Sequence, residues 1–304
     1  MLGSLCVDFV YTVERIVESG VTLASRSRDI YPGGKGLNQA VAAARAGATT
    51  CHVGAVGPDG DLLLDTLREA GVDTQDVAQI EEASGHAIIQ VDDAGQNAIV
   101  IHGGSNRTLT QAQFDGAFDR VETGDWLLLQ NEINSLDTVM SQAHERGLQV
   151  AMNLAPADER IHNYPFDKLQ LLIVNQEEGA AIIRAQAGQP SPPDADPDAT
   201  MKILVDLLPD TSIVLTMGSK GLLWRKSDNS QVHTVGSFKV QAVDETAAGD
   251  AFVGYLLAGL ATDMEWGDAL RRASAAGALT VTKPGAAPAI PVLADVEAFL
   301  AANS

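Results

Sequence analysis

The chain has 304 residues, of which 45% are hydrophobic and 20% charged, the balance expected of a globular protein. Its 40 acidic and 20 basic side chains leave a formal charge of -20, which argues against nucleic-acid binding because no basic surface can neutralise phosphates. Cys6 and Cys51 are too few for a disulfide framework and are not spaced as metal ligands. The sequence lacks a signal-peptide pattern and a long apolar run, so we expect a cytoplasmic protein without a membrane partner.

The first elements can be predicted from residue 1 onward. Only Met1 and Leu2 precede Gly3-Ser4, which leaves little room for a first strand and leaves open that the natural start lies elsewhere. The alanine-rich run 35–48 predicts a helix that ends near Gly47. A short strand over 51–57 and an amphipathic helix over 60–71 follow.

Two segments of the N-terminal third predict a small β-sheet outside the main body. Residues 9–32 alternate loosely, and residues 86–102 form two apolar runs around Asp92–Gln96, which is a hairpin pattern. We expect the segments 9–32 and 86–103 to be inserted as a lid over a site. An edge extension and a dimer contact are equally compatible, and an exposed strand edge leaves open a homodimer through the lid.

From residue 125 onward, strands alternate with helices. Near-continuous apolar runs end at Gln130, Asn153, Asn175 and Thr216, and a helix is predicted over 134–146. Strands of this kind indicate a parallel sheet covered on both faces, hence an α/β fold that we expect to be one domain over 1–304. The proline-rich, acidic stretch Gly188–Asp198 predicts a surface loop.

The stretch 243–250 (VDETAAGD) is the most informative for function. Small residues lead into the apolar helix predicted from residue 251, with Asp250 at its start. A helix start offers unpaired N–H groups that bind an anion without a basic side chain. The Asp250 carboxylate could then accept a proton from a hydroxyl nucleophile. The alternative is a capped buried helix in which Asp250 is only a first-turn carboxylate.

Three further stretches carry weaker signals. In 33–40 (GGKGLNQA), glycines permit close approach of a ligand while Lys35 and Asn38 supply hydrogen-bond donors; the alternative is a simple turn. In 216–221 (TMGSKG), a glycine-bearing turn follows a strand end, where ligands gather in α/β sheets, although an ordinary turn looks the same. In 175–178 (NQEE), Asn and Glu could organise metal-bound water, or simply begin a helix.

Common catalytic motifs are absent from the sequence. It contains no GxxxxGK[ST] loop, GxGxxG, GxSxG or HExxH, and its histidines do not have the spacing of a zinc helix. Phosphate transfer by this chain would therefore proceed without a P-loop. A nicotinamide-dependent dehydrogenase is disfavoured because its glycine fingerprint is missing.

Taken together and in this order, the four stretches resemble the ribokinase family, also called phosphofructokinase B-type carbohydrate kinases, from Gly3 to about Pro291. The strongest matches are GGKGLNQAVAAARAGA (33–48) and DETAAGDAFVGYLLAGL (244–260), which look like the two family signatures. The resemblance implies a ribokinase-like fold: a Rossmann-like, mostly parallel sheet flanked by helices, with a small β-sheet lid. It also implies a site between lid and body.

The resemblance further implies a role for each matching residue. Asp250 is the implied catalytic base, with Ala247, Ala248 and Gly249 as the anion hole. The implied sugar contacts are Asp8, Gly34, Lys35, Asn38, Glu132 and Asp250. The implied nucleotide site comprises Asn175, Glu178, Thr216, Gly218, Gly221 and Ser274, with Glu178 acting on Mg²⁺ through water. A monovalent cation, often K⁺, is implied at Asp244, Thr246, Thr280, Lys283, Gly285 and Ala289, mostly through backbone atoms.

The implied activity is transfer of the γ-phosphoryl group of ATP to a sugar hydroxyl. Ribose, giving ribose 5-phosphate, is the first expectation, because GGKGxNQA with AAGD looks most like the ribose-specific members. A fructokinase or 2-keto-3-deoxygluconate kinase is the alternative, ahead of a nucleoside kinase or an inactive sugar-binding regulator. Four departures bear on specificity and on K⁺: Cys6 stands where ribose-specific members usually have Asn, Leu154 where Pro is common, Ser274 where Asn is, and Ala289 where Ser is.

Overall fold

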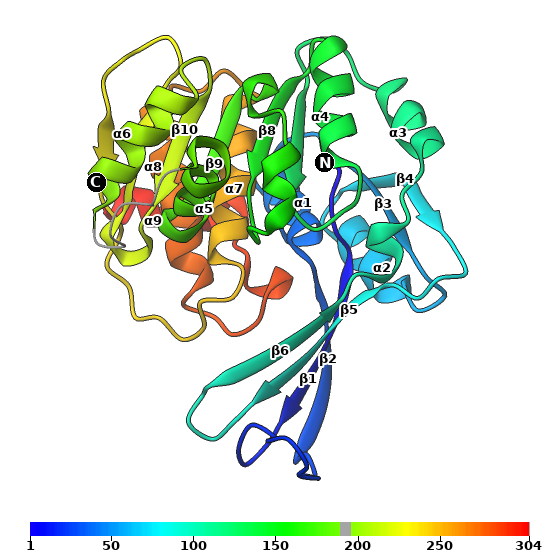
Figure 1. Cartoon of the computed structure of the whole chain (residues 1–304). Helices are drawn as coiled ribbons and strands as arrows, with labels where there is room; N and C mark the ends of the chain where they lie inside the picture. The colour runs from blue at the N-terminus through cyan, green and yellow to red at the C-terminus, as the bar shows by residue number, and fades with distance from the viewer. Residues whose placement is uncertain (189–195, 304) are drawn as a thin grey trace.

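A computed structural model describes residues 1–188 and 196–303, and its centre is a six-stranded sheet (Figure 1). The strand order is β12-β11-β10-β9-β8-β7. Their bounds are β7 Trp126–Gln130, β8 Gln149–Asn153, β9 Leu171–Asn175, β10 Ser212–Thr216, β11 Leu222–Arg225 and β12 His233–Val235. Strands β7 to β10 are parallel, and β11 and β12 are each antiparallel to the preceding strand. The predicted mostly parallel sheet is confirmed.

One buried residue joins this sheet to a parallel pair, β3 (Cys51–Val56) and β4 (Asp73–Gln79). Leu2 forms single parallel bridges to Val53 and to Leu129 of β7 and is fully buried. The strand segment before Gly3-Ser4 is thus the single residue Leu2, and the strand β1 (Cys6–Thr12) follows only at Cys6.

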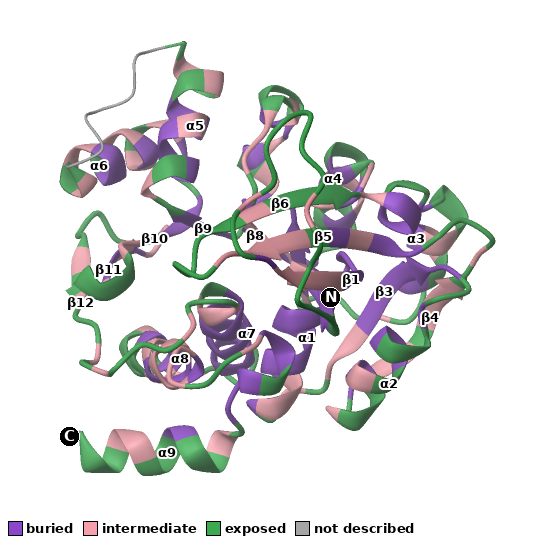
Figure 2. Ribbon diagram, turned by 90° about the horizontal axis from the view of Figure 1, so that it is seen from below, coloured by how far each residue is buried: buried purple, intermediate pink, exposed green. Residues whose placement is uncertain are grey.

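Helices cover both faces of the sheet, as Figures 1 and 2 show. Alternate residues of a strand enter different cores: Leu171 and Ile173 of β9 pack with one cluster, and Leu172 and Val174 with the other. This explains the near-continuous apolar strands, since neither face is exposed. The first cluster includes α1 (Lys35–Arg45), α2 (Asp61–Glu69), α7 (Ala248–Leu260), α8 (Trp266–Thr280) and α9 (Leu293–Ala302). The second includes α3 (Gln111–Phe118), α4 (Leu136–Glu145), α5 (Gln176–Ala187) and α6 (Pro197–Leu207).

A second sheet of four strands, in the order β2-β1-β5-β6, extends away from this body (Figure 1). Its strands are β1 Cys6–Thr12, β2 Ser27–Gly33, β5 Gly85–Val91 and β6 Asn97–His102. The predicted hairpin is confirmed, with the Asp92 amide donating to the Gln96 carbonyl at 3.0 Å. The first lid segment begins at Cys6 rather than at residue 9, because pairing with β2 and β5 already starts there.

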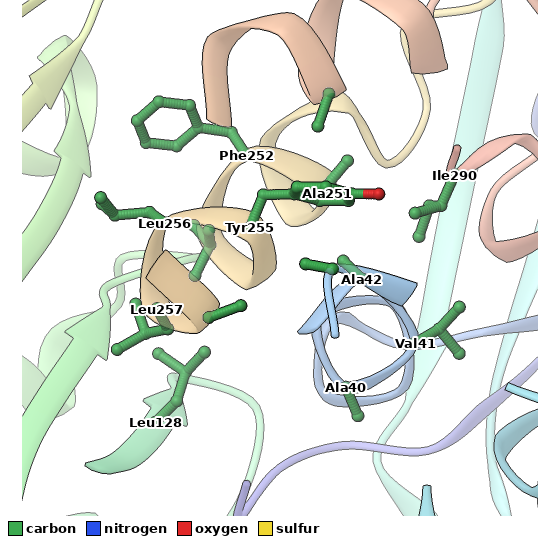
Figure 3. Packing of buried hydrophobic residues seen from close by; sticks show 14 of the residues in the cluster. Ala40, Val41, Ala42, Leu128, Ala251, Phe252, Tyr255, Leu256, Leu257 and Ile290 are labelled. Atoms are coloured by element: carbon green, nitrogen blue, oxygen red, sulfur yellow. The ribbon is translucent and has the colours of Figure 1, made fainter. Parts of the chain in front are cut away.

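Helices α1 and α7 pack unusually closely (Figure 3). A Cβ atom added to Gly254 of α7 would lie 2.4 Å from Cβ of Ala42 on α1. Small side chains on both helices permit this approach. It places the start of α7 beside the start of α1, where two of the motif stretches lie.

The proline-rich loop predicted over Gly188–Asp198 can be compared with the structure only at its ends, because 189–195 lie outside the described residues. Gly188 ends α5 in the left-handed conformation. The prediction is wrong for Pro197 and Asp198, which begin α6, because the Asp196 side chain accepts from the Ala199 amide and Pro is favourable at the first helical position. Within the described part of the chain, no helix is both long and apolar enough to cross a membrane.

Candidate active site

Asp250 lies in the first turn of α7. The residue that precedes this helix, Ala247, is its N-cap and has a left-handed backbone conformation (φ 60°). No side chain of a described residue caps this helix, and its first-turn N–H groups lack intrahelical acceptors. The buried Asp250 carboxylate accepts from Nδ2 of Asn38 and from Nε2 of Gln39, both at 2.9 Å. Both carboxylate oxygens are therefore held by side chains of another helix.

A cavity of about 880 Å³ opens in front of this turn. It brings together residues from β9, α5, β10, the β10–β11 turn, α7 and α8 that the sequence predicted for phosphoryl transfer and nucleotide binding, together with Lys35 of α1, which was predicted as a sugar contact. They are Lys35, Asn175, Glu178, Thr216, Gly218, Gly221, Ala247, Ala248, Gly249, Asp250 and Ser274. The volume falls within the usual range for a site that encloses a small ligand.

The predicted sugar contacts that do not line this cavity cluster around Glu132, just after β7. The Glu132 carboxylate accepts from the Lys35 amide at 3.1 Å and from the Ser4 hydroxyl. Asp8 of β1 reaches over Gly33, where an added Cβ would lie 2.1 Å from Oδ2 of Asp8. Gly34 has φ 94° and no space for a side chain, since its Cβ would lie 2.9 Å from the Cys6 amide nitrogen. The lid and the body thus meet at this cluster.

Charges in the site perturb one another. Burial alone would lower the pKa of Lys35, but the carboxylates of Asp250, Glu132 and Glu178 outweigh it and raise the pKa. Burial, reinforced by the Glu132 charge, raises the pKa of Asp8 to about 6. Burial also raises the pKa of Glu178 to about 7, although the Asn175 amide and Lys35 oppose it. Lys35 and Glu178 line the cavity, and perturbed groups at a cavity are typical of active sites.

Asn175 and Glu178 begin a helix, which is one of the two predicted alternatives. Each accepts a hydrogen bond from the amide of the other at 2.9 Å, which makes a capping box at the start of α5. Both residues also line the cavity. Helix capping fixes their side chains at the rim of the site.

The turn at 216–221 connects two antiparallel strands, as an ordinary turn does, and it also lines the cavity. It connects β10 to the antiparallel β11, with the Met217 amide donating to the Gly221 carbonyl at 2.8 Å. Gly221 has φ 92°, and an added Cβ would lie 2.2 Å from the Val235 carbonyl oxygen. This conformation needs glycine, and it turns Thr216 and Gly218 toward the cavity lining.

The residues predicted for a monovalent cation do not line the cavity. Asp244 accepts from the amide and hydroxyl of Thr246, at 2.9 and 2.6 Å, and from the Gly285 amide at 2.8 Å, so it ties two loops together. The Thr280 hydroxyl donates within its own helix to the Ala276 carbonyl. Lys283 follows α8, and Ala289 is buried in the short 3-10 turn Ala287–Ala289. Over residues 1–188 and 196–303 no group of three or more His, Cys, Asp or Glu could hold a metal.

Sequence reasoning missed three polar residues at the base of the site. Gln39 contacts Asp250 directly, Asn153 at the end of β8 lines the cavity, and Gln130 at the end of β7 donates to Gln39. The position of Gln39 next to Asn38 and the polar ends of two apolar strands were signals that could have indicated them.

Comparison with known proteins fits this geometry. The model of the pfkB family of carbohydrate kinases matches residues 1–293. The chain belongs to the pfkB family of carbohydrate kinases. This pfkB kinase is 30% identical to a ribokinase of Haemophilus influenzae, over 99% of this chain and 97% of the relative. As a member of this family it is an ATP-dependent sugar kinase, and the dehydrogenase alternative is excluded.

Solved structures agree with the fold of this pfkB kinase. A ribokinase from Cryptococcus neoformans in complex with ADP superposes with a TM-score of 0.87 at 31% identity, covering 98% of both chains. An Arabidopsis thaliana ribokinase with ribose and ATP has a TM-score of 0.85 at 25% identity, covering 98% of this chain and 97% of its own. The predicted ribokinase-like α/β fold is confirmed.

Proposed function

We propose that this pfkB kinase phosphorylates ribose with ATP to give ribose 5-phosphate. The observation that carries the proposal is the Asp250 carboxylate, buried at the start of α7 and held at 2.9 Å by two amide side chains, facing an 880 Å³ cavity that also contains Lys35. The similarity to ribokinases, one of them solved with ribose and ATP, supports the choice of sugar.

In this proposal Asp250 accepts the proton of the sugar hydroxyl as that oxygen forms a bond to the γ-phosphorus, while the bond from the γ-phosphorus to the bridging oxygen breaks and ADP leaves with that oxygen. The backbone amides of Ala247, Ala248 and Gly249, at the positive end of the α7 dipole, stabilise the charge that develops on the phosphoryl oxygens. Lys35 adds a positive charge near the same point. Positioning and charge stabilisation are what phosphoryl transfer chiefly requires.

The remaining predicted residues divide between the two substrates. Asp8, Gly34, Asn38 and Glu132 orient the sugar where the lid meets the body. On the other side, Asn175, Glu178, Thr216, Gly218, Gly221 and Ser274 hold the nucleotide along the carboxyl ends of β9 and β10, the usual ligand edge of such sheets. Lid strands over the sugar would exclude water and limit ATP hydrolysis. Use of ATP favours the cytoplasm as the location.

Two metal ions belong to the same proposal. Mg²⁺ would neutralise charge on the ATP phosphates, with Glu178 holding it through water, because a buried carboxylate at the cavity wall is the oxygen ligand that Mg²⁺ prefers. K⁺ would be held near Asp244, Thr246, Thr280, Lys283, Gly285 and Ala289, mostly by backbone oxygens. Asp244 would then connect that ion to the loop that leads into α7.

A homodimer through the lid is also proposed, from its apolar surface. The side chains of Ile30, Ile88, Ile99, Val100 and Ile101 are exposed on the lid strands, with Val100 67% exposed. Ile30, Ile88 and Val100 share one face of the lid sheet, and Ile99 and Ile101 lie on the other face of the edge strand β6. Exposed apolar side chains at a sheet edge favour association with another subunit. We expect the second subunit to cover these residues.

Turnover assays test the function. ADP release is measured with pentoses, hexoses, sugar acids and nucleosides, each with and without K⁺; ribose is expected to give the highest kcat/KM. Asp250→Asn should lower kcat by about 10²–10⁴-fold while the sugar still binds. The matched control is Asp268→Asn, the exposed first-turn acid of α8, which should leave kcat unchanged. Near-normal turnover of Asp250→Asn would reject the base, and no ADP release with any sugar would indicate an inactive regulator.

A further inference from the structure

Beneath Asp250, a chain of buried amides runs from the sheet to the catalytic helix. Gln130, the last residue of β7, donates from Nε2 to Oε1 of Gln39 at 2.7 Å. Gln39 of α1 in turn donates from Nε2 to Oδ1 of Asp250 and to Oδ1 of Asn153, both at 2.9 Å. Gln39 and Gln130 are both fully buried. Neither lines the cavity, so neither is placed to touch ATP.

Asp250, at the end of this series of hydrogen bonds, determines which group donates and which accepts in each of them. An ionised carboxylate can only accept, so the amide nitrogen of Gln39 must face Asp250. That orientation turns the oxygen of Gln39 toward Gln130, which must then present its own nitrogen. The Asn153 amide agrees with this direction, because its oxygen accepts from Gln39 while its nitrogen donates to the Ile173 carbonyl at 3.2 Å. One arrangement of the four side chains satisfies every link.

We propose that Gln39 is a positioning residue for the base Asp250, and that Gln130 acts through Gln39. The inference rests on the proposed function, in which Asp250 takes the proton. With Asn38 on Oδ2 and Gln39 on Oδ1, the carboxylate has one orientation toward the cavity.

The contribution of these hydrogen bonds can be separated from packing with methionine. Gln39→Met and Gln130→Met keep the length of the side chain and remove the amide. Gln39→Met should lower kcat by about 10²-fold, the scale of a misplaced catalytic group, with the KM for ribose and for ATP unchanged. Gln130→Met should lower kcat less, because Asn153 still holds the Gln39 amide. Thr211→Val, which removes a buried hydroxyl that donates to the Phe166 carbonyl, is the control and should leave kcat unchanged.

A double-mutant cycle decides whether Gln130 acts through Gln39. If it does, the variant with both Gln39→Met and Gln130→Met should have the kcat of Gln39→Met alone, whereas independent roles would multiply the losses. If the two losses of kcat multiply, the inference that Gln130 acts through Gln39 is overturned. A normal kcat in folded Gln39→Met, or a raised KM with normal kcat, would overturn the positioning role, provided that Asp250→Asn abolishes turnover. If Asp250→Asn remains active, the proposed function itself fails. Should Gln39→Met not fold, Gln39→Asn asks the same question with an amide too short to reach Asp250, and a normal kcat in that variant would overturn the role equally.

Discussion

Gly254→Ala should separate the two helices that form the catalytic site. Gly254 lies one turn after Asp250 on the same face of α7, against α1. An added Cβ would lie 2.4 Å from Cβ of Ala42, 2.6 Å from the Gln39 carbonyl oxygen and 2.8 Å from the Ala43 amide nitrogen. None of these atoms is the end of a flexible side chain, so the helices themselves must move.

The size of the movement follows from these distances. Carbon atoms in contact lie about 3.5–4.0 Å apart, so α7 must shift by roughly 1 Å from α1. The 2.9 Å bonds from Asn38 and Gln39 to Asp250 would then leave hydrogen-bonding range. A displacement of this size costs about 10²-fold in rate. Overpacking costs about 1–3 kcal/mol and the better helix propensity of alanine returns about 1 kcal/mol, so the net loss of stability is about 0–2 kcal/mol.

The assay compares kcat with the midpoint of thermal unfolding in the same preparations. Gly116→Ala is the matched control, since Gly116 is an exposed helical glycine of α3 whose added Cβ would meet no atom within 4 Å. That variant should gain about 1 kcal/mol of stability and keep its kcat. A Gly254→Ala enzyme with normal kcat would refute the reasoning that the close α1–α7 approach holds the base.

Three further substitutions test the lid and the sugar end. Asp8→Asn should raise the KM for sugar. Because burial raises the pKa of Asp8 to about 6, its protonated form favours folding at low pH. Between about pH 4 and 6 the free energy of unfolding should therefore fall by up to ~3 kcal/mol more in the parent than in the variant, as urea titrations at both pH values would show. Cys6→Asn should increase kcat/KM for ribose, since an amide is a better hydrogen-bond partner than a thiol; no change, or a loss, would contradict this. Val100→Asp should convert a lid-mediated dimer to a monomer in light scattering, whereas a parent enzyme that is already monomeric would exclude that dimer.

The sequence predicted those features that depend on local pattern. Continuous apolar runs such as 171–174 indicated a sheet buried on both faces, and its two faces do enter separate cores. The glycine and aspartate around 92–96 located the hairpin turn, which the structure confirms. The proline-rich loop was extended too far because Asp196 and Pro197 together form a helix start, a local signal that the acidic composition of the stretch concealed.

Features that depend on distant partners could not be predicted in this way. The bridging role of Leu2 between β3 and β7 requires the strand order, which no local pattern contains. The contact of Gln39 with Asp250 joins residues separated by 211 positions, and the motif around Gln39 gives no indication of which side chain faces which partner. The packing of α1 against α7 determines which side chain of α1 faces Asp250.

Because the net charge is -20, the protein as a whole repels ATP, and the attraction that binds it must come from groups within the site. The carboxylates of Asp250, Glu132 and Glu178 raise the pKa of Lys35, and together they outnumber its single positive charge. A highly charged triphosphate entering such a site needs positive potential from another source. The start of α7 supplies part of it through the positive end of the helix dipole, and a divalent cation on the phosphates would supply the rest. We therefore expect ATP without a divalent cation to bind this site much more weakly, since Glu178 and Asp250 then repel the phosphates with nothing between them.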